Sequence, residues 1–228
     1  MQKKYMAIQL LLLQQFLQIP VKYQVANNTR NNLTDRNLVD KVLSGDTNAF
    51  GIIIKDTEKL VAQIVFKMIN NPEDRKDLAQ DIYLKVYKNL PAFQFQSKLS
   101  TWIAQVGYNA CYDHLRKKKL VLPDEINKEE NVSENVLDSL SQVFSPKQND
   151  SYAGINQKEL LKILQAEVEN LSPVYKTLIG LYHQEELSYE EISQITGLPD
   201  GTVKSYLFRA RKKLKETLLL HYKKEDLC

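Results

Sequence analysis

Residues 188–214 read SYEEISQITGLPDGTVKSYLFRARKKL, and this stretch predicts two short helices joined by a tight turn. Ser188 and Glu191 have the S-x-x-E spacing of a capping box, in which each side chain satisfies a backbone donor at a helix start. Gly197 can adopt the left-handed conformation that ends such a helix. A helix, a brief glycine-containing turn and a second helix are the parts of a helix-turn-helix.

The second of these helices, capped by Asp200 or Thr202, has two unlike faces. Its apolar face, which can pack on the first helix, consists of Val203, Leu207, Ala210, Leu214 and Leu218. Its opposite face consists of Lys204, Ser205, Phe208, Arg209 and Lys212, with Arg211 and Lys213 on the flanks. No acidic residue occurs between Thr202 and Leu214, as expected for a helix that enters the major groove beside phosphates. A basic helix face that is merely solvated would show the same charges. We favour DNA binding over this alternative because the capping box and the turn directly precede the basic helix.

Composition limits the remaining interpretations. The chain has 228 residues, 43% of them hydrophobic, and a net charge of only +3, which argues against coating nucleic acid by charge alone. Basic residues outnumber acidic ones in residues 29–119, whereas acidic residues outnumber basic ones in residues 120–155. This acidic stretch lacks helical periodicity and contains proline and glycine, so we interpret it as a flexible linker between two small domains.

Both predicted domains, residues 29–119 and 156–228, show helical periodicity, and no segment alternates with period two for long. The helix starts and stops that the sequence predicts are Thr34 or Asp35, Pro91, Ser100 or Thr101, and Ser172 with Pro173. We therefore predict an all-α fold of two small helical bundles on a tether, the C-terminal bundle being the helix-turn-helix.

The first 28 residues begin with MQKKYMAIQLLLLQQFLQIP, which resembles a signal peptide only superficially. Glutamines interrupt the apolar run, no small-residue cleavage site follows, and the run is shorter than the ~20 apolar residues that span a bilayer. We predict a disordered N-terminal extension; a membrane-associated regulator is the alternative in which this run matters. Cys111 and Cys228 provide no disulfide framework, which fits a reduced cytoplasmic compartment.

The helix predicted after Thr101 has a nucleic-acid character of its own. Its polar stripe, at helical spacing, consists of Gln105, Asn109, Tyr112 and Arg116. Amide side chains read base edges, and Arg116 with the three lysines after it can hold phosphates. Aromatic residues precede or line this helix, namely Phe93, Phe95, Trp102 and Tyr108. Aromatic faces beside basic residues capture unstacked bases, although Phe93, Trp102 and Tyr108, taken singly, favour a place in the core.

Three stretches together resemble a known family: DRKDLAQDIYLKVYKNLPAF (74–93), STWIAQVGYNACYDHLRKKK (100–119) and residues 171–214. They are similar to bacterial RNA polymerase sigma factors of the extracytoplasmic-function group. The resemblance covers residues 34–119 and 156–218, in the order that the family has. It implies a promoter-specificity factor whose partners are core RNA polymerase and promoter DNA, and it adds an anti-sigma factor as a candidate partner, since such factors commonly hold this group inactive.

The resemblance also assigns residues. Those that match the helix docking on the polymerase clamp are Asp77, Leu78, Gln80 and Asp81. Those that match the loop and helix reading the melted minus-ten element are Phe95, Gln96, Ser97, Lys98, Trp102, Asn109, Asp113 and Arg116. Those that match positions reading the minus-thirty-five element are Lys204, Ser205, Phe208, Arg209 and Lys212. Tyr206 stands where the family often has arginine, and Asp81 replaces a common glutamate.

Two other function classes are open at this point. A stand-alone helix-turn-helix regulator would explain residues 156–218 but not the first domain. A metal enzyme would need more than Cys111 and His114, which supply two ligands where zinc requires three or four. No phosphate-cradling glycine loop or catalytic constellation occurs, so we expect neither a cofactor nor an enzyme activity.

Overall fold

The computed structural model of the protein describes residues 24–118 and 157–225. The N-terminal block comprises α2 (Gln24–Leu43), α3 (Thr47–Met68), α4 (Pro72–Asn89), the short 3-10 helix η2 (Leu90–Ala92) and α5 (Leu99–Lys117). The C-terminal block comprises α8 (Gln157–Glu169), α9 (Pro173–His183), α10 (Tyr189–Thr196) and α11 (Asp200–Glu225). No strand occurs in these two ranges, which confirms the all-α prediction. The predicted linker and residues 1–23 lie outside the described residues.

The N-terminal block is a helical bundle in which α5 packs against both α3 and α4. Asp46 begins α3 by accepting hydrogen bonds from the backbone of Asn48 and Ala49. The predicted end of α4 at Pro91 is confirmed, because the α-helix stops at Asn89 and Pro91 lies in η2. Ile64, Ile82 and Ile103, from three different helices, are fully buried. The core of the block therefore lies between α3, α4 and α5.

Two predicted helix starts in this block are wrong. The helix α2 begins at Gln24, so Thr34 and Asp35 lie within it and do not begin a helix. The helix α5 begins at Leu99, with Lys98 rather than Ser100 or Thr101 at the capping position. The physical reason is a tertiary cap: the Asp35 carboxylate accepts a hydrogen bond from the Leu99 backbone N–H, 3.1 Å away.

The C-terminal block follows most of its local sequence signals, although α11 begins at Asp200 itself, so neither Asp200 nor Thr202 precedes that helix as its cap. Ser188 and Glu191 form the predicted capping box, and Gly197 ends α10 in the left-handed conformation (φ 73°). Ser172 precedes Pro173 at the start of α9, as predicted. The predicted apolar face of α11 is buried at Val203, Leu207, Ala210 and Leu214, whereas the side chain of Leu218 lies outside the described ones. Local pattern was therefore sufficient to predict this helix-turn-helix.

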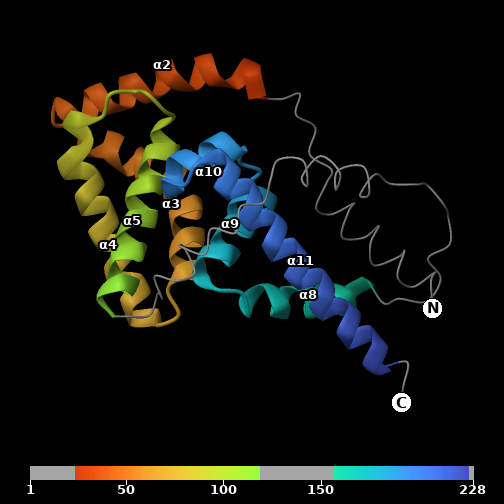
Figure 1. The fold of residues 1–228 in the computed structure, drawn as a ribbon. Helices are drawn as coiled ribbons and strands as arrows, with labels where there is room; N and C mark the ends of the chain where they lie inside the picture. Colours follow the sequence, from red (N-terminus) through yellow and green to blue (C-terminus); the bar gives the residue numbers. More distant parts are fainter. Residues whose placement is uncertain (1–23, 119–156, 226–228) are drawn as a thin grey trace.

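The two blocks pack against each other, which the sequence did not predict. The helix α9 contacts α3, and α10 contacts α5 (Figure 1). The buried hydrophobic residues form one cluster that continues from one block into the other. Within the described ranges, no helix is long and apolar enough to cross a membrane.

Candidate nucleic-acid interface

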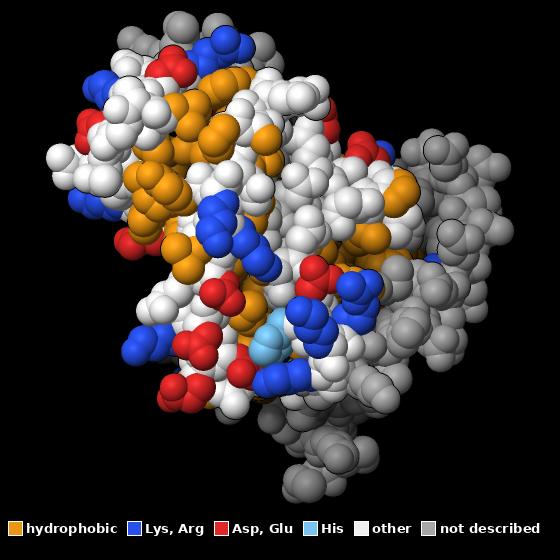
Figure 2. Space-filling view, turned by 90° about the vertical axis from the view of Figure 1, so that its left-hand side faces the viewer, with side chains coloured by type: hydrophobic (Ala, Val, Ile, Leu, Met, Phe, Trp, Pro, Cys, Tyr) orange, Lys and Arg blue, Asp and Glu red, His pale blue; other side chains and the backbone are white. Residues whose placement is uncertain are grey.

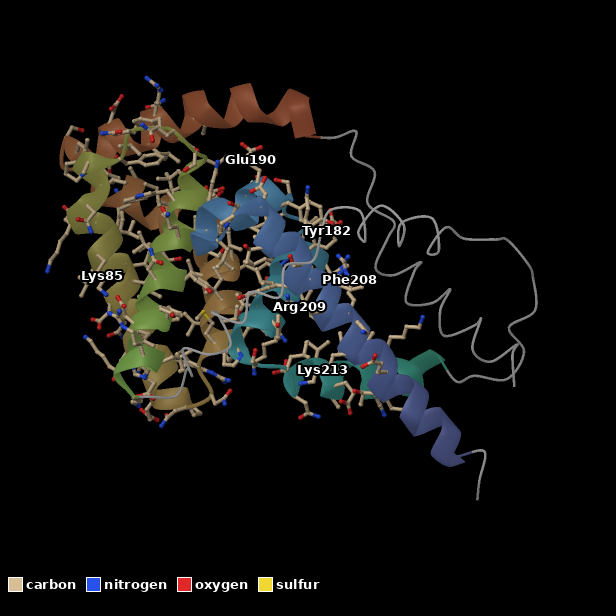
Figure 3. The ribbon with its side chains drawn as sticks, in the orientation of Figure 1. Lys85, Tyr182, Glu190, Phe208, Arg209 and Lys213 are labelled. Atoms are coloured by element: carbon tan, nitrogen blue, oxygen red, sulfur yellow. The ribbon has the colours of Figure 1, made fainter. Side chains whose placement is uncertain are left out.

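The outer face of α11 is basic and free of acids between Thr202 and Leu214. Lys204 and Lys212 are exposed, while Phe208 and Arg209 are half-buried; Figure 3 shows Phe208, Arg209 and Lys213 along this helix. The Ser205 hydroxyl donates a hydrogen bond to the Gly201 carbonyl at 2.6 Å, which holds that side chain against its own helix. This face has the charge that a duplex-binding helix needs.

A stack of aromatic rings supports two of the basic side chains on α11. The rings of Tyr182 and Tyr189 are stacked with their centroids 5.1 Å apart. The Arg211 guanidinium lies 4.8 Å from the Tyr182 ring centroid, and the Lys204 ammonium lies 5.7 Å from that of Tyr189. Cations are attracted to aromatic faces at these distances, so the tyrosines restrain both side chains. This pair was not predicted, because the tyrosines carry no local sequence signal that would bring them together.

Arg211 is held on its other side by His183. The Arg211 Nε–H donates to the Nε2 atom of His183 at 3.3 Å. Burial, together with the positive charge of Arg211, lowers the pKa of His183 to about 3. The imidazole is therefore neutral at physiological pH and can accept the hydrogen bond.

Tyr206 does not belong to the exposed face of α11. Its side chain is 5% exposed, and its ring packs edge-on against Tyr175 of α9 at a centroid distance of 5.3 Å. An arginine would carry its charge into this buried position, which explains on packing grounds why tyrosine occurs here.

The loop between η2 and α5 is built on an aromatic cluster. The Phe93 ring lies 4.6 Å from that of Phe95 and 5.0 Å from that of Trp102, and the Arg36 guanidinium lies 4.7 Å from the Phe95 ring. The predicted core positions of Phe93 and Tyr108 are confirmed by their burial, while Trp102 is half-buried. Phe95 has a φ of 56°, a strained conformation for a residue with a side chain, so the loop is held in one unusual shape.

Lys98 joins this loop to the C-terminal block. Gln96 is exposed and donates a hydrogen bond to Gln94, and Ser97 is half-buried. Lys98 Nζ donates to the Glu191 carboxylate of α10 at 2.8 Å. The candidate base-holding loop is therefore in contact with the helix-turn-helix.

The polar stripe of α5 lies on the surface, as predicted. Asn109 and Arg116 are exposed, and Gln105 and Tyr112 are half-buried. Arg116 forms an ion pair with Asp113 at 3.1 Å, one turn earlier on the same helix. The stripe thus offers amide, hydroxyl and guanidinium groups from one rigid helix.

The residues predicted to bind the polymerase clamp do not all face solvent. Asp77, Gln80 and Asp81 are exposed on α4, but Leu78 is buried in the core at 8% exposure. A largely apolar groove that includes Gln80 was not predicted from the sequence; it is lined by Phe50, Ile54, Ala79, Gln80, Tyr83, Leu84 and Tyr87. Leu84 and Tyr87 are 57% and 48% exposed, although α4 has a separate buried face. Figure 2 shows hydrophobic side chains gathered on this side of the molecule.

Cys111, one of the two candidate metal ligands, is buried. Burial raises the pKa of Cys111 to about 12, which opposes the thiolate form that binds metals. His114 Nε2 lies 3.4 Å from the Asp74 carboxylate. The part of the chain that the structure describes contains no group of three or more residues able to hold a metal ion.

Comparisons with known proteins agree with both blocks. Residues 53–121 match the family described as Sigma-70 region 2, and residues 161–214 match Sigma-70, region 4. The chain is 31% identical over 180 residues to the ECF RNA polymerase sigma factor SigW of Bacillus subtilis, covering 79% of this chain and 94% of that one.

A second relative and a solved structure extend the agreement. The chain is 30% identical over 187 residues to the ECF RNA polymerase sigma-E factor of Haemophilus influenzae, covering 82% of this chain and 96% of that one. Its fold is similar to that of CnrH, solved in complex with the cytosolic domain of CnrY, with a TM-score of 0.53 and 20% identity, covering 81% of this chain and 96% of CnrH.

Proposed function

Because the chain belongs to the extracytoplasmic-function (ECF) sigma factors of the sigma-70 family, which direct RNA polymerase to promoters, we propose that its two blocks divide promoter reading between them. The protein is a transcription initiation factor that binds core RNA polymerase and promoter DNA. What we propose here is the residues that carry out each part of this task. A stand-alone helix-turn-helix regulator is not favoured, since region 2 is present as well.

The minus-thirty-five element is assigned to α11, through Lys204, Ser205, Phe208, Arg209 and Lys212. The observation that carries the proposal is the basic outer face of this helix between Thr202 and Leu214, which has no acid and lies opposite four buried apolar residues. Lysine and arginine neutralise phosphates, while the side chains of Ser205 and Phe208 can contact base edges and thymine methyl groups.

The minus-ten element is assigned to the aromatic loop and to α5. Phe95, Gln96, Ser97 and Lys98 surround the place where we expect one unstacked base to bind, beside the half-buried Trp102. Asn109, Asp113 and Arg116 follow along α5 toward the next bases. Strand opening then requires no nucleotide hydrolysis, because preferential binding of the unpaired strand shifts the equilibrium toward the melted state.

Core polymerase is assigned to the exposed side of α4. Asp77, Gln80 and Asp81 supply polar contacts, and the groove around Leu84 and Tyr87 supplies apolar area. Leu78 acts from the core by fixing the position of α4. Polymerase binding places two weak DNA-binding blocks on one promoter, so each raises the effective concentration of the other.

Run-off transcription tests these assignments. Core polymerase with this protein should give discrete new start sites on its target promoters, and an Asp77→Arg, Asp81→Arg double variant should abolish them. Asp40→Arg, which reverses an exposed acid on α2, is the matched control and should leave transcription unchanged. Equal transcription with the double variant and with the control would contradict the polymerase surface.

We propose a cytoplasmic location, where an initiation factor meets RNA polymerase and the chromosome. We propose no catalytic reaction, because initiation factors of this family act by binding. We also propose that an anti-sigma factor binds this protein. In support, CnrH, which has a similar fold, was solved in complex with the cytosolic domain of a second protein, CnrY.

A further inference from the structure

Among the described side chains, three ion pairs join the two blocks, and all have the same polarity. Lys59 pairs with Glu185, Lys67 with Glu169, and Lys98 with Glu191. In each pair the lysine belongs to the N-terminal block and the glutamate to the C-terminal block. The two surfaces that meet are therefore complementary in charge, as in protein interfaces that recognise one partner.

Close packing accompanies the charges. Gln63 of α3 donates to the Gln184 side chain at 2.7 Å. A Cβ atom on Gly180 of α9 would lie 2.9 Å from the Gln63 amide nitrogen, so glycine permits this close approach. The continuous hydrophobic cluster described above lies behind these polar contacts.

Glu191 has two functions at this interface. Its carboxylate completes the capping box by accepting from the Ser188 backbone N–H at 3.0 Å, and it also accepts from Lys98. Its side chain is only 15% exposed. Burial alone would raise the pKa of Glu191, but the hydrogen bonds from Lys98 and Ser188 bring that pKa below its ordinary value. The lysine of the candidate base-holding loop therefore already has a well-ordered anionic partner.

This arrangement is incompatible with reading both promoter elements at once. The minus-ten and minus-thirty-five elements are separated by about 25 base pairs, or roughly 85 Å at the ~3.4 Å rise of B-DNA. Here a residue of the minus-ten loop touches the first helix of the helix-turn-helix. The two blocks must therefore separate before both elements can be bound.

We propose that the free protein is held in a closed form that covers part of its own DNA-binding surface. In this form, glutamates of the C-terminal block pair with lysines of the N-terminal block, and Glu191 takes the place of a promoter phosphate at Lys98. This inference rests on the proposed function, which assigns Lys98 to DNA. It gives a role to two of the acids that precede the acid-free stretch of α11: Glu185 and Glu191 pair with lysines of the other block instead of facing the promoter.

The closed form leaves an entry point for the polymerase. The apolar groove that we assign to core polymerase is lined by residues of α3 and α4 alone, and Leu84 and Tyr87 remain exposed. Polymerase can therefore dock on α4 while the blocks are closed, and promoter DNA then competes with Glu191 for Lys98.

The test is zero-length carbodiimide cross-linking of the full-length chain, which joins lysines to carboxylates only when they are in ion-pair contact. The wild-type protein should give the Lys67–Glu169 and Lys98–Glu191 products. Glu191→Gln keeps the capping box, in which glutamine can replace glutamate, but removes the charge that holds Lys98. The blocks should then separate more often, so the yield of the Lys67–Glu169 product should fall severalfold. Glu190→Gln, which changes net charge equally at an exposed neighbouring position, should leave it unchanged (Glu190 is labelled in Figure 3).

Binding of a labelled single-stranded minus-ten oligonucleotide to the free protein gives a second measurement. Glu191→Gln should tighten this binding severalfold, whereas Glu190→Gln should match the wild type. Lys67→Glu opens the interface from the other side with the capping box intact, and it should decrease the Lys98–Glu191 product. Absence of the cross-block products in the wild type, or equal behaviour of the two glutamine variants, would overturn the proposal.

Run-off transcription at saturating core polymerase separates this proposal from the proposed function. Wild-type protein that supports transcription but gives no cross-block products would refute closure alone. Protein that gives the products but supports no promoter-specific transcription would refute the promoter assignment, and with it the reading of Glu191 as a phosphate substitute.

Discussion

The carboxylate of Asp35, in the middle of α2, accepts a hydrogen bond from the backbone N–H of Leu99, which begins α5. The two residues are 64 positions apart, so one helix supplies the N-terminal cap of another. Because Lys98 directly precedes Leu99, this contact also fixes the end of the aromatic loop. Burial raises the pKa of Asp35, although the Leu99 hydrogen bond acts in the opposite direction.

Asp35→Ala should therefore destabilise the N-terminal block by about 1 kcal/mol, the usual cost of losing an N-terminal cap. Asp35→Asn should retain most of that stability, because an amide oxygen can also accept the bond. Urea denaturation measures both variants, and Asp40→Ala on the same helix is the control for a lost surface acid. An alanine variant as stable as the wild type would show that the cap is dispensable.

The stacked rings of Tyr182 and Tyr189, which lie beside basic side chains of α11, lead to a second prediction. Tyr189→Ala removes the ring beside Lys204, and we expect the loss of about 0.5–1 kcal/mol, or roughly two- to fivefold in affinity for minus-thirty-five DNA. Tyr189→Phe keeps the ring and should bind as the wild type does. Fluorescence anisotropy of holoenzyme with a duplex promoter measures the difference. A phenylalanine variant as weak as the alanine variant would assign the effect to the hydroxyl instead.

His183 gives a prediction about pH. Its pKa falls from an ordinary 6.5 to about 3 on folding, so between these values the unfolded chain binds a proton that the folded chain does not. Stability should therefore decrease as pH falls below about 6.5, with a slope of at most about 1.4 kcal/mol per pH unit from this residue.

His183→Gln should flatten this dependence, because glutamine can accept from Arg211 without titrating. Urea denaturation at pH 7 and pH 5 is the appropriate comparison. The pKa values of Glu169 and Glu191 are ordinarily 4.5 and lower in the folded chain, so their contributions are lost mainly in more acid conditions. An unchanged difference in the free energy of unfolding between the two pH values would exclude His183 as its source.

These contacts indicate which parts of the molecule could be predicted from sequence. The capping box at Ser188, the glycine end at Gly197 and the buried face of α11 depend on residues within a few positions of one another. Periodicity and spacing are sufficient for such features. The helical class and the helix-turn-helix followed directly from them.

Contacts between distant segments left no local pattern to recognise. The cap from Asp35, the Lys98–Glu191 pair and the burial of Tyr206 depend on how helices pack, not on any helix alone. The exposed groove on α4 was missed for a related reason. Leu84 and Tyr87 are apolar residues of an amphipathic helix, and only the structure distinguishes them from its buried face.

That groove provides the last prediction. Leu84→Ser should weaken binding of core polymerase by roughly 1–2 kcal/mol, or about five- to thirtyfold, because buried apolar anchors dominate protein interfaces. The stability of the free protein should be nearly unchanged, since Leu84 is 57% exposed and its replacement creates no cavity.

Leu43→Ser removes an equally large side chain that is 51% exposed on α2, outside the groove, and it should bind polymerase normally. Titration of labelled protein with core polymerase measures all three proteins. Equal loss in both variants would indicate a general effect of surface hydrophobicity, whereas loss in Leu84→Ser alone would locate the polymerase contact in the groove between α3 and α4.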